Sequence, residues 1–248
     1  MNSKVFEKIV SDRLLAFLES NNFLSKLQFG FRRKTSTTHA ITAILNTITE
    51  KLNDNNFVLL LLLDIKKCFD SLSRDILFSK LENAGVRGIC LDWFKSYFSN
   101  RRQRVFVNGT SSSTTLEIIF GVLQGSVLGV LLFLIYINDL PESCEILLNF
   151  LFADDDSAVI AARSLIDLIN IANSEVFKLT QWYSSNKLTI HPGKTKALIF
   201  RGPRTELDLY MHEPSKKLYL PLFLNLNNAG ENDITKIIPI NLIWIILQ

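Results

Sequence analysis

The chain is poor in cysteine and lacks a long uninterrupted apolar run. Its three cysteines, Cys68, Cys90 and Cys144, form no Cys-x-x-C pair. Their odd number and spacing argue against a disulfide framework or a zinc site, and predict reduced thiols inside a cell. The apolar runs 131–137 and 242–247 are shorter than the ~18 residues that a membrane-spanning helix needs. We therefore expect no membrane association.

The first residues also lack the apolar segment of a secretory signal peptide, since residues 1–8 carry two lysines and a glutamate. We expect an intracellular protein, located in the nucleus, the cytoplasm or both, and not a secreted one. The net charge is only +3, which does not by itself predict binding to nucleic acid. The basic residues gather in three clusters, each typical of a solvated surface when taken alone: 32–34, 101–104 and 194–204.

The chain is rich in hydrophobic residues that can form a core. Hydrophobic residues make up 48% of 248 residues, which is enough for one large domain or two small ones. Helical spacing of apolar residues predicts helices near 4–20, 37–52, 74–84, 91–99 and 165–186, and a buried helix from about residue 131. Strands are predicted at 57–63 and 197–200, with hairpins at 105–120 and 147–162, and a glycine-containing loop at 121–129. This order favours an α+β fold.

The acidic pair Asp154-Asp155 stands between two apolar runs, 147–151 and 158–162. This pattern predicts a β-hairpin with two carboxylates at its turn. Asp64 ends another apolar run, 57–63, and acids at the ends of neighbouring strands can meet. Buried carboxylates are costly unless they are paired, and a divalent metal is a common partner. The alternative is a solvated turn and an ordinary strand-terminating aspartate.

Six segments of the chain carry recognisable motifs. They are Gln28-Phe29-Gly30-Phe31-Arg32 with Ser36-Thr37, Asp64–Asp70, Gly121–Gly129, Leu132–Leu140, Phe152-Ala153-Asp154-Asp155, and Asn186-Lys187-Leu188 with Lys194-Thr195-Lys196. In this order the six segments resemble the reverse transcriptases of non-LTR retrotransposons, in the jockey-like LINE group. The resemblance covers about residues 4–200.

The resemblance implies a polymerase palm, in which helices pack on one face of an antiparallel sheet. It divides the chain into partial fingers at 1–56, the palm at 57–200 and a diverged C-terminal segment at 201–248. The family's upstream triphosphate-binding segment precedes the first residue of this chain, and no primer-grip pattern is recognisable after Phe200. We therefore expect a thumb that is poor or absent.

The same resemblance implies DNA synthesis from dNTPs on an RNA template with a DNA primer. Two Mg²⁺ ions, or Mn²⁺ as an alternative, would stabilise the attacking and leaving oxygens. By resemblance, Asp64 and Asp154 are the principal metal ligands, Asp155 is the third acid, the Ile65 carbonyl assists, and Lys194 donates a proton to the leaving pyrophosphate.

Further residues receive roles by the same resemblance. Phe69 would lie beneath the incoming sugar and exclude a 2′-hydroxyl, and Gln124 and Gly125 would lie along the incoming nucleotide. Nucleic-acid contacts are expected from Arg32, Arg101, Arg102 and Arg104.

The chain also departs from the family's pattern. Asp156 replaces a small polar residue and is expected to be a solvated turn residue. Leu123 and Val130 replace two prolines, which removes two conformational restraints from the loop.

Three other interpretations remain open. The chain can be a decayed or domesticated remnant that only binds nucleic acid, and primer extension would distinguish it. A palm-fold nucleotidyl cyclase would use similar acids, but Gln124-Gly125 and Phe69 argue against it. A purely structural module leaves the strand-end acids unexplained. We expect the chain alone to be a weak or inactive polymerase.

Overall fold

The computed structural model describes residues 2–104, 106–107, 110–111, 115–122, 125–191, 193–202 and 243–247. The chain forms two compact units, each assembled from two separate segments. Unit 1 comprises Met1–Leu24 and Lys67–Ile137, and unit 2 comprises Ser25–Lys66 and Asn138–Gln248. The division into fingers, palm and C-terminal segment stays a prediction, and most of 201–248 lies outside the described residues.

Unit 2 contains a five-stranded sheet in the order β6-β7-β1-β8-β9. The first four strands pair antiparallel, whereas β9 pairs parallel with β8. The predicted α+β class is confirmed. The elements of this unit are α2 (Thr37–Asn53), β1 (Phe57–Asp64), the 3₁₀ helix η1 (Leu140–Glu142), β6 (Leu148–Phe152), β7 (Asp155–Ala162), α7 (Leu165–Ser185), β8 (Lys196–Arg201) and β9 (Ile243–Leu247).

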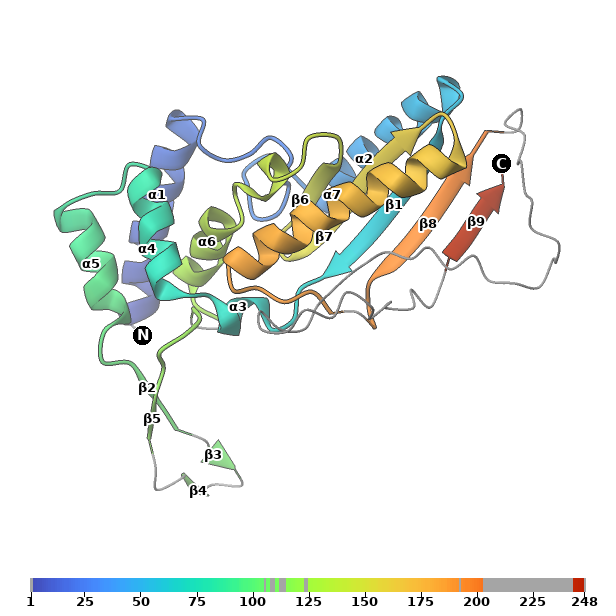
Figure 1. Ribbon diagram of the computed structural model, residues 1–248. Coiled ribbons are helices and arrows are strands. Elements are labelled where there is room, and N and C mark those ends of the chain that lie inside the picture. The colour runs from blue at the N-terminus through green and yellow to red at the C-terminus, as the bar shows by residue number, and fades with distance from the viewer. Residues whose placement is uncertain are drawn as a thin grey trace. The chain divides into compact units, whose positions relative to one another are not determined.

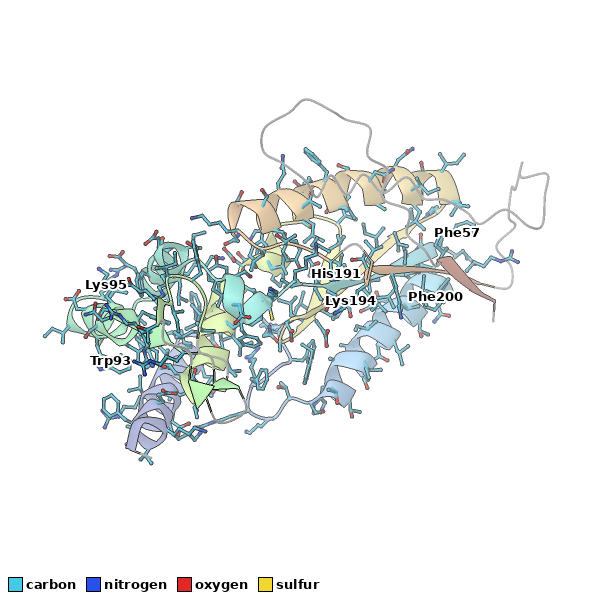
Figure 2. All side chains as sticks on the ribbon, turned by 90° about the horizontal axis from the view of Figure 1, so that it is seen from below. Phe57, Trp93, Lys95, His191, Lys194 and Phe200 are labelled. Atoms are coloured by element: carbon cyan, nitrogen blue, oxygen red, sulfur yellow. The ribbon has the colours of Figure 1, made fainter. Side chains whose placement is uncertain are left out.

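Helices cover both faces of this sheet, with α7 on one face and α2 on the other (Figures 1 and 2). On the α2 face, Ile48 packs in one buried cluster with Val58 and Val159. The resemblance implied helices on one face only, and the structure differs in this respect. The reason lies in the run 57–63, which has no polar alternation. A strand of that kind is buried on both faces.

Serine caps fix the starts of both long helices in unit 2. The Ser36 side chain accepts a hydrogen bond from His39 N at the start of α2. At the start of α7, the Ser164 hydroxyl accepts from Asp167 N at 3.0 Å and donates to its carboxylate at 2.7 Å. Such reciprocal caps satisfy backbone donors that have no partner inside the helix.

Unit 1 is mainly helical, and α6 is its most buried element. In this helix every residue from Leu131 to Tyr136 is buried, and α6 contacts both α1 and α4. Two short ladders, β2–β5 and β3–β4, lie where one hairpin was predicted. The elements are α1 (Asn2–Ser20), α3 (Cys68–Ser71), α4 (Arg74–Asn83), α5 (Ile89–Phe98), β2 (Arg102–Gln103), β3 (Phe106–Val107), β4 (Thr110–Ser111), β5 (Leu116–Glu117) and α6 (Val127–Tyr136).

The buried helix begins earlier than the sequence suggested. The predicted loop extended to Gly129, but α6 starts at Val127, and the Ser126 side chain accepts a hydrogen bond from Gly129 N at 2.9 Å. Valine at position 130, unlike proline, leaves the helical conformation open to the residue before it. Gly129 therefore lies inside the helix. Among the helices that the structure describes, none is long and apolar enough to cross a membrane.

Candidate active site

Two of the predicted acids lie directly opposite each other in the sheet of unit 2. Asp64, the last residue of β1, is the register partner of Asp155, the first residue of β7. Side chains of opposite residues in antiparallel strands lie on the same face, with Cβ atoms roughly 4.5–5.5 Å apart. Ala153 and Asp154 form the two-residue turn between β6 and β7, so that Asp154 directly precedes Asp155. The strand ends thus bring the three acids to one edge of the sheet.

The electrostatics of this edge favour a cation. Burial raises the pKa of Asp155, and the neighbouring charges of Asp154 and Asp64 raise it further. The part of this rise in pKa that comes from the neighbouring carboxylates reflects mutual repulsion, which a bound positive charge relieves. Asp64 itself is only partly covered, with a side chain 33% exposed. The acids are therefore accessible to ions.

The Ile65 carbonyl is oriented toward the same edge. Ile65 forms an antiparallel bridge with Ile190, and the flanking bonds run from Lys66 N to Thr189 O at 2.8 Å and from His191 N to Asp64 O at 2.7 Å. In such a pair the bridged residue's own carbonyl points away from its partner. The Ile65 carbonyl therefore points to the side of β1 on which β7 lies.

These groups suit Mg²⁺ better than a metal that needs a complete protein cage. Within the part of the chain that the structure describes, no three His, Cys, Asp or Glu side chains form a ready-made metal site. Mg²⁺ is usually held by one or two carboxylates together with substrate phosphates. Two or three carboxylates and a backbone carbonyl are therefore a fitting set of ligands.

Lys194 reaches the acids from the loop between α7 and β8. The amides of Lys194 and Thr195 both donate to the His191 carbonyl at 3.1 Å, which closes a tight turn before β8. The Lys194 ammonium nitrogen then lies 3.1 Å from Asp64 Oδ2. Figure 2 shows His191 and Lys194 together at this point of the chain. The structure thus places the predicted proton donor beside a predicted metal ligand.

The expectation that Asp156 is a solvated turn residue is wrong. Asp156 is 1% exposed, and Tyr183 on α7 donates its hydroxyl to Asp156 Oδ2 at 3.0 Å. Burial raises the pKa of Asp156 to about 7, and the Tyr183 hydrogen bond opposes that rise. Strand alternation carried the signal, because Asp156 shares its face with the buried residues Ala158 and Ile160.

Phe69 and the start of the glycine-containing loop are held together in unit 1. Val122 N donates to the Phe69 carbonyl at 2.8 Å, and a Cβ on Gly121 would lie 2.7 Å from that oxygen. The half-buried Phe69 ring lies 4.9 Å from the ring of Phe133. Gly125 is exposed with φ +79, and Gln124 lies outside the described residues. The placement of Phe69 over the acids stays a prediction.

The four predicted nucleic-acid contacts differ in their surroundings. Arg32 Nη1 donates to the carbonyls of Ser25 at 2.6 Å and Gln28 at 3.2 Å, so this side chain braces its own loop. The Arg101 guanidinium lies 4.3 Å from the Tyr97 ring centre. Arg102 and Arg104 are exposed. Contact with nucleic acid stays a prediction for all four.

An apolar pocket of about 530 Å³ in unit 1 is a separate feature. Its lining includes Phe6 and Phe17 of α1 and Trp93 of α5, and it contains no carboxylate. The predicted metal ligands lie at the acidic edge in unit 2, whereas the lining of this pocket contains no carboxylate to bind a metal ion.

Comparison with known proteins identifies the family of this chain. The family model described as "Reverse transcriptase (RNA-dependent DNA polymerase)" matches residues 1–220. A probable RNA-directed DNA polymerase from transposon X-element of Drosophila melanogaster is 26% identical over 245 residues, which are 95% of this chain and 27% of that protein. The corresponding protein from transposon BS is 28% identical over 242 residues, covering 90% of this chain and 26% of that protein.

A solved structure shares the fold. Telomerase from Candida tropicalis, in complex with a fragment of telomeric RNA, matches with a TM-score of 0.55 at 14% identity, over 78% of this chain and 33% of that one. The chain spans 27% of the length of its X-element relative. Because the family model covers residues 1–220 of 248, the chain belongs to the reverse transcriptase family.

Proposed function

We propose that this chain carries the palm of a retrotransposon RNA-directed DNA polymerase, which transfers a nucleotide from a dNTP to a primer 3′-hydroxyl. The observation that carries the proposal is the direct pairing of Asp64 with Asp155 across β1 and β7, one residue from Asp154. A metal-dependent nucleotidyl transfer needs carboxylates converging from separate strands. If Asp154 and Asp155 only formed a solvated turn, nothing would require Asp64 to lie opposite Asp155.

Reverse transcriptases as a family use divalent metal ions, and Mg²⁺ is the proposed ion here, with Mn²⁺ as an alternative. Asp64, Asp154, Asp155 and the Ile65 carbonyl would hold two ions. When bound, such ions stabilise charge on the attacking and leaving oxygens of an in-line displacement. The carboxylates provide the negative potential that attracts them, and the raised pKa of Asp155 supports this role.

Lys194 is the proposed proton donor. Its ammonium lies 3.1 Å from Asp64 Oδ2. Because the Lys194 side chain is 64% exposed, the ammonium can turn from the carboxylate toward a leaving pyrophosphate. Proton transfer from Lys194 Nζ to the pyrophosphate oxygen would prevent accumulation of charge there. General-acid assistance of this kind contributes roughly 10²–10⁴-fold.

The substrate assignments rest on the family and on unit 1. An RNA template, a DNA primer and dNTPs are the proposed partners, and the related telomerase was solved with telomeric RNA. Phe69 is proposed to exclude the 2′-hydroxyl, with Gln124 and Gly125 along the nucleotide. Arg102 and Arg104 are the better candidates for phosphate contact, because Arg32 and Arg101 already bind carbonyls of their own segments.

Primer extension on an RNA template tests the proposal, with Mg²⁺ and radiolabelled dNTPs. Measurable incorporation that disappears in Asp64→Asn and Asp154→Asn is the expected result, even if the rate is low. Asp167→Asn is the matched control, because Asp167 lies in the first turn of α7, beyond the opposite end of β7. Nucleic-acid binding with no incorporation under any condition would instead support the remnant interpretation.

A further inference from the structure

We propose that Gln28 is a positioning residue that fixes the turn of the acidic hairpin, an inference that rests on the proposed metal-binding role of Asp154 and Asp155. Gln28 is 1% exposed. Its side-chain oxygen accepts a hydrogen bond from Gly30 N at 2.7 Å and another from Ala153 N at 3.2 Å. One buried acceptor thus binds both its own loop and the residue that precedes Asp154.

The turn needs such support because of its backbone conformation. Ala153 has φ +58, a left-handed conformation that residues with a Cβ rarely adopt. Conformations of this kind persist only where the surrounding structure determines them. Ala153 is 5% exposed, so its N–H group has little access to water. The Gln28 side chain supplies the acceptor that this N–H group requires.

The backbone of the Gln28 segment also follows the hairpin closely. Phe29 N donates to Leu151 O at 2.7 Å, and Leu151 N donates to Leu27 O at 2.8 Å. These two bonds place the segment alongside β6. Next to them, a Cβ on Gly30 would lie 2.2 Å from Ala153 N. Only glycine allows the loop to approach the turn this closely.

The acceptor function can be separated from simple packing. Gln28 Nε2 is buried and has no hydrogen-bond partner among the described groups, and an unpaired buried donor is a cost to stability. Leucine would fill similar space and remove the acceptor, whereas glutamate would keep an acceptor oxygen. A carboxylate is costly to bury at a position that is only 1% exposed, and it adds negative charge near Asp154. Gln28→Glu therefore serves as the comparison only for the hydrogen bond to Ala153, and not for metal affinity.

Two measurements test the inference on the full chain: hydrogen exchange of the Ala153 amide by NMR, and Mn²⁺ affinity by electron paramagnetic resonance. In Gln28→Leu the Ala153 amide should exchange at least tenfold faster. Mn²⁺ should bind about tenfold more weakly, as is typical when an outer-shell partner of a metal ligand is lost. Gln28→Glu should retain the protection of the Ala153 amide, because it keeps the acceptor oxygen.

A glycine pair provides a second route if Gln28→Leu fails to fold. Gly30→Ala should displace the turn and weaken Mn²⁺ binding, whereas Gly193→Ala should not, because a Cβ there meets the His191 ring at 3.5 Å, an ordinary contact. Unchanged exchange at Ala153 and unchanged Mn²⁺ affinity in Gln28→Leu would overturn the inference. Absence of Mn²⁺ binding in the unmodified chain would instead refute the proposed function, while the exchange measurement would still decide the contact.

Discussion

The ammonium nitrogen of Lys194 lies 3.1 Å from Asp64 Oδ2. The cation proposed to protonate the leaving group therefore interacts with a carboxylate proposed to hold the metal. A divalent ion held by Asp64 would compete with the Lys194 ammonium for this carboxylate. Metal binding would release Lys194 from Asp64, so that its proton becomes available to the substrate only when the ion is in place.

This competition predicts effects of opposite sign in Lys194→Ala. Mn²⁺ affinity should rise by up to about fivefold, because an exposed ion pair contributes roughly 0.2–1 kcal/mol. Nucleotide incorporation should fall by about 10²-fold or more, because the general acid is lost. Lys196→Ala, an exposed lysine at the start of β8, is the matched control. Equal losses of incorporation in the two variants would refute the proton-donor role.

Gly121 provides a test of the contact between Phe69 and the glycine-containing loop. Gly121→Ala should destabilise unit 1 more than Gly88→Ala, although both positions have positive φ. Each substitution introduces backbone strain of about 1–3 kcal/mol. Only at Gly121 does the new Cβ also meet backbone, 2.7 Å from Phe69 O, whereas nothing lies within 4 Å of a Cβ at Gly88. Urea unfolding of the two variants measures the difference, and equal losses would contradict it.

Glu175 on α7 holds the segment that leads into β6. Its carboxylate Oε2 accepts hydrogen bonds from the amides of Glu145, Ile146 and Leu147 at 3.0–3.2 Å, and Oε1 accepts from Lys178 Nζ at 2.9 Å. Glu175→Gln should lower the free energy of unfolding by about 1–3 kcal/mol, because the charge-assisted bonds that the buried Glu175 carboxylate accepts are weakened. Lys178→Ala removes the ion pairs of a partly exposed lysine with Glu145 and Glu175 but leaves the three amide hydrogen bonds in place, so it should cost less than Glu175→Gln.

The pH dependence gives a second measurement of the same contact. Burial alone would raise the pKa of Glu175, but the amide of Ile146, the Lys178 ammonium and the amide of Leu147 together hold it below the ordinary value of 4.5. A carboxyl with a lowered pKa stabilises the folded state above its unfolded pKa, and that contribution is lost as the pH falls through the folded pKa. Glu175→Gln should therefore lose less stability than the unmodified chain between pH 5 and about pH 3.

The sequence predicted the parts of the fold that follow from apolar periodicity. The 21-residue helix α7 and the strand ending at Asp64 lie where the pattern placed them. The acids at the strand ends suggest that the strand ending at Asp64 lies beside the acidic hairpin. Only the structure shows that Asp64 is the register partner of Asp155. The sequence predicts that the buried helix starts near residue 131, because Gly129 suggests a loop. In the structure α6 starts at Val127, directly after the Ser126 cap.

The roles of Gln28 and Gly30 were not apparent from the sequence, although both belong to a recognisable motif. Their contacts with Ala153 join residues 125 and 123 positions apart along the chain. No local pattern specifies which distant backbone atom a buried amide will meet. Asp156 was misjudged for a related reason, because the neighbouring acids suggested a solvated turn while its buried partner Tyr183 lies on a later helix.

The Asp156–Tyr183 pair predicts an unusual dependence of stability on pH. The pKa of Asp156 is raised by burial from 3.8 to about 7 in the folded chain. A carboxyl with a raised pKa stabilises the folded state below its unfolded pKa, and that contribution is lost as the pH rises through the folded pKa. Asp156 should therefore reduce the free energy of unfolding between pH 4 and pH 7, by up to about 1.4 kcal/mol per pH unit.

Two variants isolate this contribution by urea unfolding across that range. Asp156→Asn can still accept a hydrogen bond from Tyr183 but carries no titrating group, so its stability relative to the unmodified chain should increase steadily from pH 4 to pH 7 and then level off. Tyr183→Phe removes the hydrogen bond that lowers the pKa of Asp156, and should extend the decline to higher pH. If the difference between Asp156→Asn and the unmodified chain is constant across this range, Asp156 does not change protonation there, and its burial does not raise its pKa as the structure indicates.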